Sequence, residues 1–207
     1  MSSDTRMSRY PKTEKGKESL NKIINAALDL ISEKGFMNTS IGDITNRAGV
    51  AYGLFYFYFK TKNDVLDELI RQFNREMRHY LKVNTSGIED RIEMEKVGFR
   101  KFLEWIDKNK KYYKVFIEAQ VHRPEMYIWH YKKLAERYMI GLKEAMEKGQ
   151  IVKTDPELLA YTLIGIGEML AKRYFLWTNQ GLDEKLFNDL DLLIENLLRP
   201  NPHAKQS

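Results

Sequence analysis

The sequence predicts an all-α protein of about nine helices. Over its 207 residues, apolar side chains recur every three or four positions, which is the spacing of one buried helix face. No segment alternates apolar and polar residues in the manner of a half-buried strand. Glycine, proline and short polar residues interrupt the periodic segments where helices would begin and end. We therefore expect a small helical domain in residues 1–62 and a larger helical domain in residues 63–207.

The second of the predicted helices, after residue 40, is recognised from the signals at its two ends. Ser40 and Asp43 have the spacing of a capping box, so the second helix begins directly after Ser40. It ends at Gly49, because glycine tolerates the positive φ that a tight turn between helices needs.

The third predicted helix, residues 51–59, is crowded with aromatic rings. Helical spacing turns one set inward, namely Leu54, Phe55, Tyr58 and Phe59. It leaves another set outward, namely Tyr52, Gly53, Tyr56 and Phe57. A phenol can donate a hydrogen bond to a phosphate oxygen, and a ring can rest on a sugar or a thymine methyl group. Lys60 and Lys62 add positive charge at the helix end, so this segment has the chemistry of a DNA-contacting helix.

Between residues 39 and 62 the sequence carries an ordered pattern: Thr39, Ser40, Ile41, Ile44, Ala48, Gly49, Val50, Gly53, Phe55, Tyr56, Tyr58, Phe59 and Lys62. In this pattern, the first third of the chain resembles the TetR/AcrR family of transcriptional regulators. The resemblance implies a three-helix DNA-binding unit over residues 19–60. Its first helix would end at Gly35 and carry the apolar residues Leu20, Ile23, Ile24, Ala27, Leu30 and Ile31. Two positions depart from the family pattern: Ala51 stands where a serine is usual, and Thr45 where an alanine is usual. Because Ala51 has no hydroxyl, the third helix lacks a side-chain cap at its start.

The resemblance implies which residues contact duplex DNA. The predicted set is Thr39, Ser40, Tyr52, Gly53, Leu54, Tyr56, Phe57, Tyr58, Lys60 and Lys62. Thr39 and Ser40 would meet phosphate at the start of the second helix, while Tyr56 and Lys62 would hold the DNA backbone. The residues nearest the base edges would be Tyr52, Gly53, Leu54 and Phe57. None of these offers the bidentate pairing of Arg or Asn with a base, so recognition would depend on methyl contacts and DNA shape.

Six further helices are expected after residue 62. Their predicted ranges are 63–82, 94–106, 112–121, 124–148, 154–179 and 183–198. Pro124 and Pro156 fit the first turns of two of these helices, and Gly149 and Gly181 fit the ends of two. The two polar ends of the chain are expected to be loose.

The last two helices carry more apolar surface than one small core requires. The residues we assign to a dimer interface are Leu159, Leu163, Ile166, Leu170, Leu190, Leu193 and Leu197. Packing within one chain is the alternative explanation for each of them. The family resemblance favours a four-helix interface between two copies. Two recognition helices related by a two-fold axis would then enter successive major grooves about 34 to 36 Å apart, which predicts a palindromic operator.

The middle of the chain is rich in aromatic rings, and the resemblance implies that a small-molecule effector enters this bundle. The residues we assign to the effector site are Phe99, Phe102, Trp105, Phe116, Tyr127, Tyr131, Arg173 and Phe175. Ordinary core packing is again the alternative. The apolar lining favours a long hydrophobic effector such as a fatty acyl chain or its coenzyme A thioester. An anionic head group could be bound by Arg100, Lys101, Arg123 or Arg173. The effector would release DNA by favouring an arrangement in which the two recognition helices no longer match the groove spacing.

Charge and composition limit the other classes of function. The net charge is +5, and residues 1–62 hold ten Lys or Arg against six Asp or Glu. The chain has no cysteine, which excludes disulfides and thiol catalysis and suits a reducing cytoplasm. The longest apolar stretch, residues 158–170, is too short to span a bilayer. We therefore expect a cytoplasmic protein without a membrane segment.

Two alternative functions remain open on the sequence. The first is an enzyme. Glu118 and His122 stand four residues apart and could form half of a metal site, but such a pair is usually an ordinary helix-surface pair. Because no nucleophile motif is present, we expect neither an enzyme nor a metal or other cofactor. The second rival is a helical protein-interaction module whose exposed rings meet a protein. Salt separates these readings, since affinity for DNA falls steeply with ionic strength.

Overall fold

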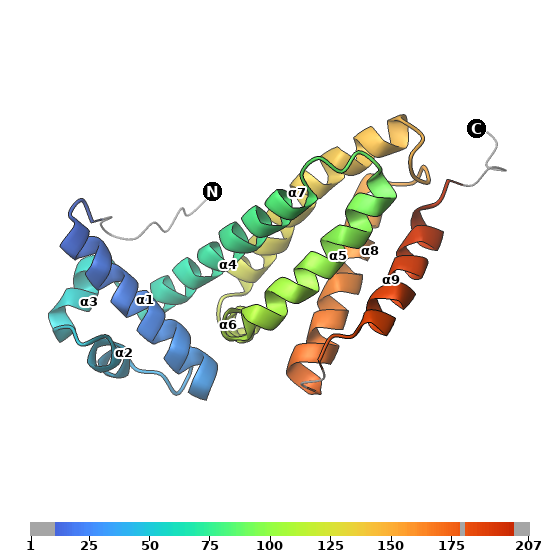
Figure 1. The fold of residues 1–207 in the computed structure, drawn as a ribbon. Coiled ribbons are helices and arrows are strands. Elements are labelled where there is room, and N and C mark those ends of the chain that lie inside the picture. The colour runs from blue at the N-terminus through green and yellow to red at the C-terminus, as the bar shows by residue number, and fades with distance from the viewer. Residues whose placement is uncertain (1–10, 179–180, 201–207) are drawn as a thin grey trace. The chain divides into compact units, whose positions relative to one another are not determined.

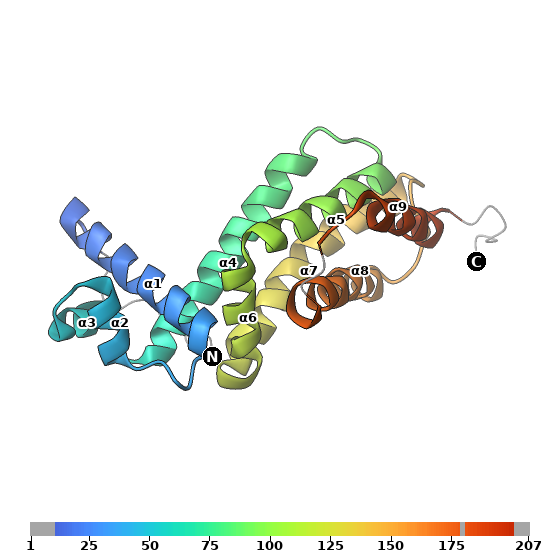
Figure 2. The same cartoon turned by 60° about the horizontal axis from the view of Figure 1, so that its bottom comes forward.

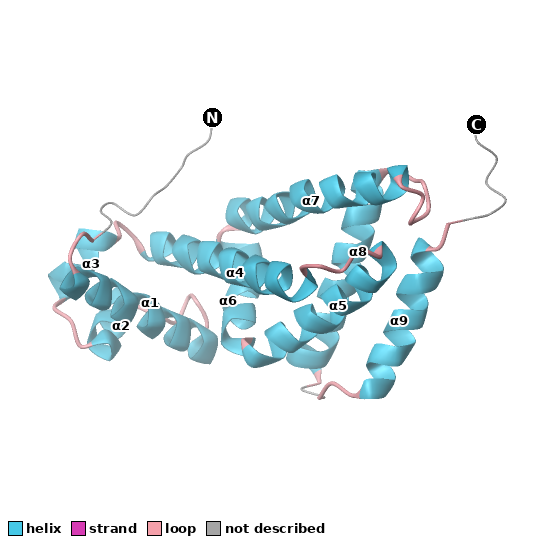
Figure 3. Ribbon diagram, turned by 45° about the horizontal axis from the view of Figure 1, so that its top comes forward, coloured by secondary structure: helices cyan, strands magenta, loops and turns pink. Residues whose placement is uncertain are grey.

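The computed structural model describes residues 11–178 and 181–200, and in these ranges every regular element is a helix. Figure 3 shows this all-helical architecture, and Figure 1 gives the order of the elements. The described residues form nine α-helices and one π-helical segment, which confirms the predicted fold class. The predicted loose ends and the predicted helix end at Asn179 lie at least partly outside the described residues.

The described residues fall into two compact units. The first contains the residues up to Arg75 together with Asn109–His130, and the second contains Glu76–Lys108 together with the residues from Tyr131 onward. The helices α4 (Lys62–Thr85) and α7 (Pro124–Glu147) therefore contribute to both units. The predicted boundary between residues 62 and 63 separates a DNA-binding domain from an effector-binding and dimerisation domain. It stays a prediction.

The first unit begins with three helices that Figure 1 shows clustered together: α1 (Glu14–Lys34), α2 (Ile41–Ala48) and α3 (Tyr52–Tyr58). The helix α1 starts before the predicted Ser19, because the Thr13 side chain accepts the Gly16 N–H at 3.2 Å and caps it earlier. The predicted apolar face is buried at Leu20, Ile23, Ile24, Ala27, Leu30 and Ile31. This face packs α1 against α2 and against α6 (Lys110–His122).

Ring stacking joins α4, α6 and α7 within the first unit. The ring centroids of Phe73 and Phe116 lie 4.6 Å apart in nearly parallel planes, and those of Phe116 and Tyr127 lie 5.0 Å apart. Asn74 and His130 are both buried, and their side chains share a hydrogen bond of 3.0 Å. Rings from three helices thus form a continuous core, and the buried Asn74 and His130 side chains within it are hydrogen-bonded, as buried polar groups usually are.

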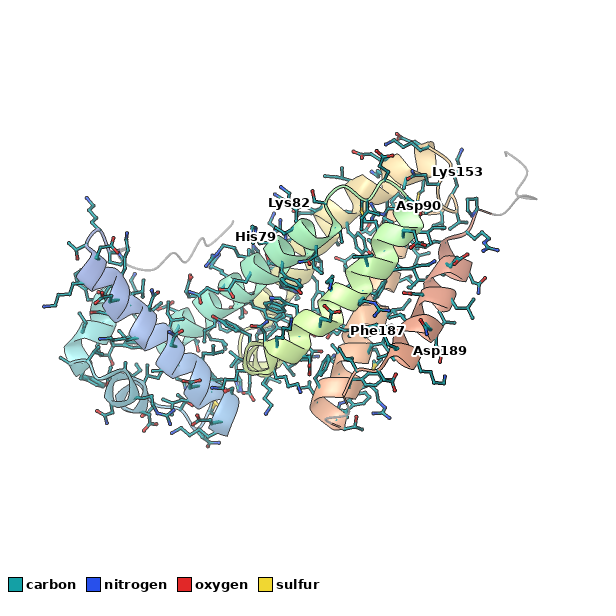
Figure 4. All side chains as sticks on the ribbon, viewed as in Figure 1. His79, Lys82, Asp90, Lys153, Phe187 and Asp189 are labelled. Carbon is teal, nitrogen blue, oxygen red and sulfur yellow. The ribbon has the colours of Figure 1, made fainter. Side chains whose placement is uncertain are left out.

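The second unit contains α5 (Arg91–Lys108), α8 (Pro156–Ala171), the π-helical segment η1 (Lys172–Trp177) and α9 (Glu184–Leu198). The helix α5 packs against both α8 and α9, and Figure 2 gives a second view of these elements. Figure 4 labels Phe187 on α9, which is buried beneath the Arg100 guanidinium of α5 at 4.1 Å from the ring centroid. Apolar contacts and this cation–π contact therefore join α9 to α5.

The predicted continuous helix over residues 154–179 is divided in the structure. Asp155 caps its start by accepting the Leu158 N–H at 2.7 Å, and Pro156 occupies the first turn as predicted. After Ala171 the winding loosens into η1, where the Thr178 hydroxyl donates to the Arg173 carbonyl at 2.9 Å. In the described part of the chain, no helix is both long and apolar enough to cross a membrane.

Candidate nucleic-acid interface

The start of α2 is fixed by reciprocal hydrogen bonds between Ser40 and Asp43. The Ser40 hydroxyl accepts the Asp43 N–H at 3.0 Å, and the Asp43 carboxylate accepts the Ser40 N–H at 2.9 Å. This arrangement confirms the predicted capping box. The Lys34 ammonium lies 2.9 Å from the same carboxylate. Hydrogen bonds from Lys34 and Ser40 hold the pKa of Asp43 well below its usual range.

The turn between α2 and α3 depends on Gly49, whose φ of 65° lies in the left-handed region. This conformation lets the Val50 N–H donate to the Thr45 carbonyl at 3.1 Å and close the C-terminus of α2. The next helix, α3, begins at Tyr52, and Ala51 before it provides no side-chain cap, as its missing hydroxyl predicts. The helix pair therefore has a well-defined end on α2 and a weakly defined start on α3.

The helix α3 divides into a buried face and an exposed face. Phe55, Tyr58 and Phe59 are buried. Tyr52, Tyr56 and Phe57 remain 56%, 46% and 44% exposed, which confirms the predicted outward orientation of these rings. A Cβ atom added to Gly53 would meet nothing within 4 Å. The exposed face is therefore two tyrosines and a phenylalanine around an open glycine.

Two of the exposed rings form a pair. The hydroxyl oxygens of Tyr52 and Tyr56 lie 3.2 Å apart, and the ring centroids are 5.6 Å apart in an edge-on arrangement. The hydrogen bond with Tyr52 raises the pKa of Tyr56. Because each phenol restricts the other, the rings present a more ordered surface than isolated tyrosines would.

The structure corrects the predicted DNA-binding set at Thr39 and Tyr58. Thr39 is fully buried, and its hydroxyl donates to the Gly35 carbonyl at 2.9 Å. Tyr58 is 2% exposed, and its hydroxyl donates to the Gly16 carbonyl at 3.0 Å. Both hydroxyls are used inside the domain, so neither faces a phosphate. Leu54 is half-buried, whereas Ser40, Gly53 and Lys60 are exposed.

Lys62 also serves the domain itself. Its Nζ donates to the Phe36 carbonyl at 2.6 Å and to the Thr39 carbonyl at 2.7 Å. The same ammonium lies over the Phe36 ring, 4.2 Å from the centroid. The Lys62 ammonium therefore links two carbonyls of the α1–α2 turn, and its predicted phosphate contact stays a prediction. The sequence offered no sign of this, because the partners are backbone carbonyls more than twenty residues away.

Glu118 of α6 holds the other side of the same turn. Its carboxylate accepts the Phe36 N–H at 3.1 Å and lies 3.4 Å from Nε2 of His122. The His122 ring packs on the Phe36 ring at a centroid distance of 4.8 Å. Both residues of the pair considered as half of a metal site therefore contact Phe36 in the α1–α2 turn. Among the residues that the structure describes, no group of three His, Cys, Asp or Glu side chains could hold a metal ion.

The residues assigned to an effector site belong to both units. Phe116 and Tyr127 stack in the first unit. The members in the second unit are Phe99, Phe102, Trp105, Tyr131, Arg173 and Phe175. Of these, Phe102 and Phe99 meet at Gly167, where an added Cβ would lie 3.3 Å from Phe102 and 3.5 Å from Phe99. Arg173 is exposed, and its guanidinium donates to the Thr178 hydroxyl at 2.5 Å.

The apolar surface of α8 and α9 is displaced from the predicted one. Leu159, Leu163 and Leu190 are buried within the second unit, because α8 and α9 turn these side chains toward its core. Leu193 and Leu197 are 66% and 39% exposed, and Ile166 and Leu170 are half-buried. The exposed apolar residues that the prediction missed are Leu158, Tyr161, Met169 and Leu192. Ile166, Leu170, Leu190 and Leu193 contribute to the lining of an open groove of about 270 Å³ between α8, η1 and α9.

A short helix, a glycine turn and a second short helix with exposed rings define a helix-turn-helix protein. Residues 23–69 match the family model described as bacterial regulatory proteins, tetR family. Over these residues, the sequence of the helix-turn-helix is that of TetR-family regulators.

Similar proteins extend this comparison along the chain. The uncharacterized HTH-type transcriptional regulator YvdT of Bacillus subtilis is 39% identical over 80 residues, or 39% of this chain and 40% of that protein. The match therefore spans less than half of YvdT. YdgC, a second uncharacterized HTH-type transcriptional regulator of Bacillus subtilis, is 25% identical over 176 residues, or 78% of this chain and 84% of that protein. The fatty acid degradation regulator FadR of Bacillus halodurans shares the fold with a TM-score of 0.75 and 22% identity, over 89% of this chain and 96% of that one.

Proposed function

We propose that the protein is a transcriptional regulator that binds a palindromic operator as a homodimer and is released from it by a small hydrophobic effector. The observation that carries the proposal is the helix α3, whose Tyr52, Tyr56 and Phe57 rings stand exposed beyond a glycine turn. Large exposed rings on a short helix call for a partner surface. In a protein of this family, duplex DNA is the partner with the matching shape and chemistry.

The dimer is supported by the exposed apolar face of α8 and α9. Leu158 and Leu193 are 64% and 66% exposed, and an apolar face of this extent is characteristic of an interface. We expect Leu193→Glu to give a monomer at concentrations where the unmodified chain is a dimer, as measured by sedimentation equilibrium. Asn188→Glu, at an exposed residue of the same helix that does not line the groove, offers a control. A chain that is already monomeric without substitution would remove the basis for two-fold operator recognition.

The effector class is supported by the shared fold with FadR of Bacillus halodurans, which is named a fatty acid degradation regulator. Buried rings of the second unit, such as Phe99 and Phe175, provide apolar surface suited to an acyl chain. We propose a long-chain fatty acyl group, presented as its coenzyme A thioester, as the effector. Binding would shift the population toward an arrangement with low operator affinity, which makes the protein a repressor.

Operator affinity measured by fluorescence anisotropy tests the DNA-binding part of the proposal. The operator is first selected from a random duplex library with the full-length protein. We expect the logarithm of the association constant to fall linearly with the logarithm of salt concentration, as counterions are released from phosphate. A weak response to salt would instead favour the alternative of a protein-interaction module.

The effector is tested by adding oleoyl-coenzyme A to the operator complex, with acetyl-coenzyme A and free coenzyme A as matched controls. We expect the long-chain thioester alone to lower operator affinity by roughly five- to 150-fold, the usual range of coupling between sites. Equal effects of all three compounds, or none, would overturn the acyl effector and leave DNA binding untouched.

A further inference from the structure

The exposed face of α3 has a chemistry that limits which bases it can read. The helix consists of Tyr52–Tyr58 with the sequence Tyr-Gly-Leu-Phe-Tyr-Phe-Tyr, so it carries neither charged nor amide side chains. Its exposed groups are the rings of Tyr52, Tyr56 and Phe57 and the bare backbone at Gly53. On α2, the Arg47 guanidinium is held by the Glu33 carboxylate through hydrogen bonds of 3.3 and 3.1 Å.

Base pairs differ in the groups that they present in the major groove. Guanine is discriminated by bidentate Arg or Lys, adenine by Asn or Gln, and cytosine by Asp or Glu. None of these side chains lies on α3. A lone tyrosine hydroxyl can donate or accept, so it separates the bases poorly. The thymine 5-methyl group is the remaining feature, because it is recognised by apolar contact with groups such as a phenylalanine ring.

The geometry of α3 suits such contacts. Gly53 and Phe57 are four residues apart and so lie on one side of the helix, next to the stripe formed by Tyr52 and Tyr56. An added Cβ at Gly53 would meet nothing within 4 Å, so a base edge can approach the helix backbone beside the rings. The hydroxyls of Tyr52 and Tyr56 bond each other at 3.2 Å, which limits the movement of both rings.

We propose that α3 selects its operator by contacting thymine 5-methyl groups in the major groove. Phe57 and the Tyr52 ring make the contacts, and Gly53 provides the clearance. This inference rests on the proposed function and deepens it by naming the feature of the DNA that is recognised. It makes the operator half-site rich in thymine at the positions that face α3.

The experiment removes the methyl groups from the DNA. In the selected operator, each thymine of a half-site is replaced singly by deoxyuridine, which keeps base pairing and deletes only the methyl group. We expect a loss of roughly two- to fourfold in affinity at one or two positions of each half-site, the value of one methyl group taken out of water. Replacement by 5-bromodeoxyuridine at the same positions restores an apolar group of similar size and should restore affinity.

The protein is then varied against the same duplexes. Phe57→Ala should lower affinity for the thymine operator and abolish the loss on deoxyuridine at one position, because the coupled contact is already absent. Asn46 of α2 is exposed and supplies the matched control. Asn46→Ala should leave the ratio between thymine and deoxyuridine duplexes unchanged. Equal melting temperatures of both variants confirm that each is folded.

Each outcome decides between the inference and the proposed function. If deoxyuridine is tolerated at every position while selective, salt-dependent binding persists, methyl recognition is overturned and the proposed function stands. The inference is equally overturned if Phe57→Ala retains the full ratio between the duplexes and Tyr52→Ala does too. If the unmodified protein selects no sequence at all, the proposed function fails, and the inference fails with it.

Discussion

Lys62 and Lys60 provide a matched pair of charges that separates stabilisation of the domain from contact with DNA. Lys62 donates to two backbone carbonyls of the α1–α2 turn, at 2.6 and 2.7 Å. Lys60 has an exposed side chain at the end of α3. We therefore expect the substitutions Lys62→Met and Lys60→Met to have different effects, although each removes one positive charge and keeps an unbranched apolar stem.

The magnitude for Lys62 follows from the bonds that are lost. Each hydrogen bond to a charged group is worth roughly 1.5–3 kcal/mol. Because Lys62 is partly exposed, the lower value applies to each of its two bonds. Loss of both bonds should lower the free energy of unfolding by about 3 kcal/mol. For a chain of this size that is a decrease of roughly 6–12 °C in melting temperature. Lys60→Met should leave the melting temperature unchanged.

Binding to the operator should give the opposite pattern. If Lys60 neutralises one phosphate, Lys60→Met flattens the slope of log affinity against log salt by about 0.9. Lys62→Met should retain the slope of the unmodified protein when measured well below its melting temperature. Calorimetry and anisotropy titrations over a range of salt concentrations provide the two measurements. A Lys62 variant with unchanged stability and a flatter slope would refute the assignment of its ammonium to the turn.

Three further predictions concern stability. Gly141→Ala would place a Cβ 2.4 Å from the Arg91 guanidinium, which is paired with a buried carboxylate; we expect chemical denaturation to show a loss of about 3 kcal/mol, typical of a disturbed buried ion pair. Gly165→Ala meets nothing within 4 Å, so it should stabilise α8 by up to about 1 kcal/mol, and a large loss would contradict the open surface there. Asp43 has a pKa held below its ordinary 3.8 by Lys34 and Ser40. Its stabilisation is therefore complete above that value and is lost as pH falls through the lower folded-state pKa, whereas Asp43→Asn should show a weaker loss in melting curves below pH 4.

Local signals explain why the helices could be predicted from the sequence. The capping box at Ser40 and Asp43, the turn at Gly49 and the proline at the start of α7 all act through neighbouring residues. Helical spacing likewise placed the exposed rings of α3, because burial on a short helix follows its own period. The departure at Ala51 was equally readable, since a cap requires a side chain at that position.

Distant partners explain what could not be predicted. The family resemblance assigned Lys62 to phosphate, whereas in the structure its ammonium donates to the carbonyls of Phe36 and Thr39. Leucine spacing on α8 and α9 identified apolar stripes without showing which stripe faces the core. Leu159 and Leu163 are buried while Leu158 is exposed, and packing against α5 decides that choice. The loosening of α8 into η1 left no signature in the periodicity.

The contact between Glu118 and the Phe36 amide bears on how this protein can be cut and recombined. A fragment that ends at residue 62 would carry the whole helix-turn-helix, yet it would lack the carboxylate that pairs with that amide and the α6 surface that covers α1. A chimera that joins this helix-turn-helix to another regulator should therefore also include residues 110–122, although they come nearly fifty positions later in the chain. The helix-turn-helix and its supporting contacts therefore come from two separate segments of the sequence, and only the N-terminal segment contains the helix-turn-helix motif.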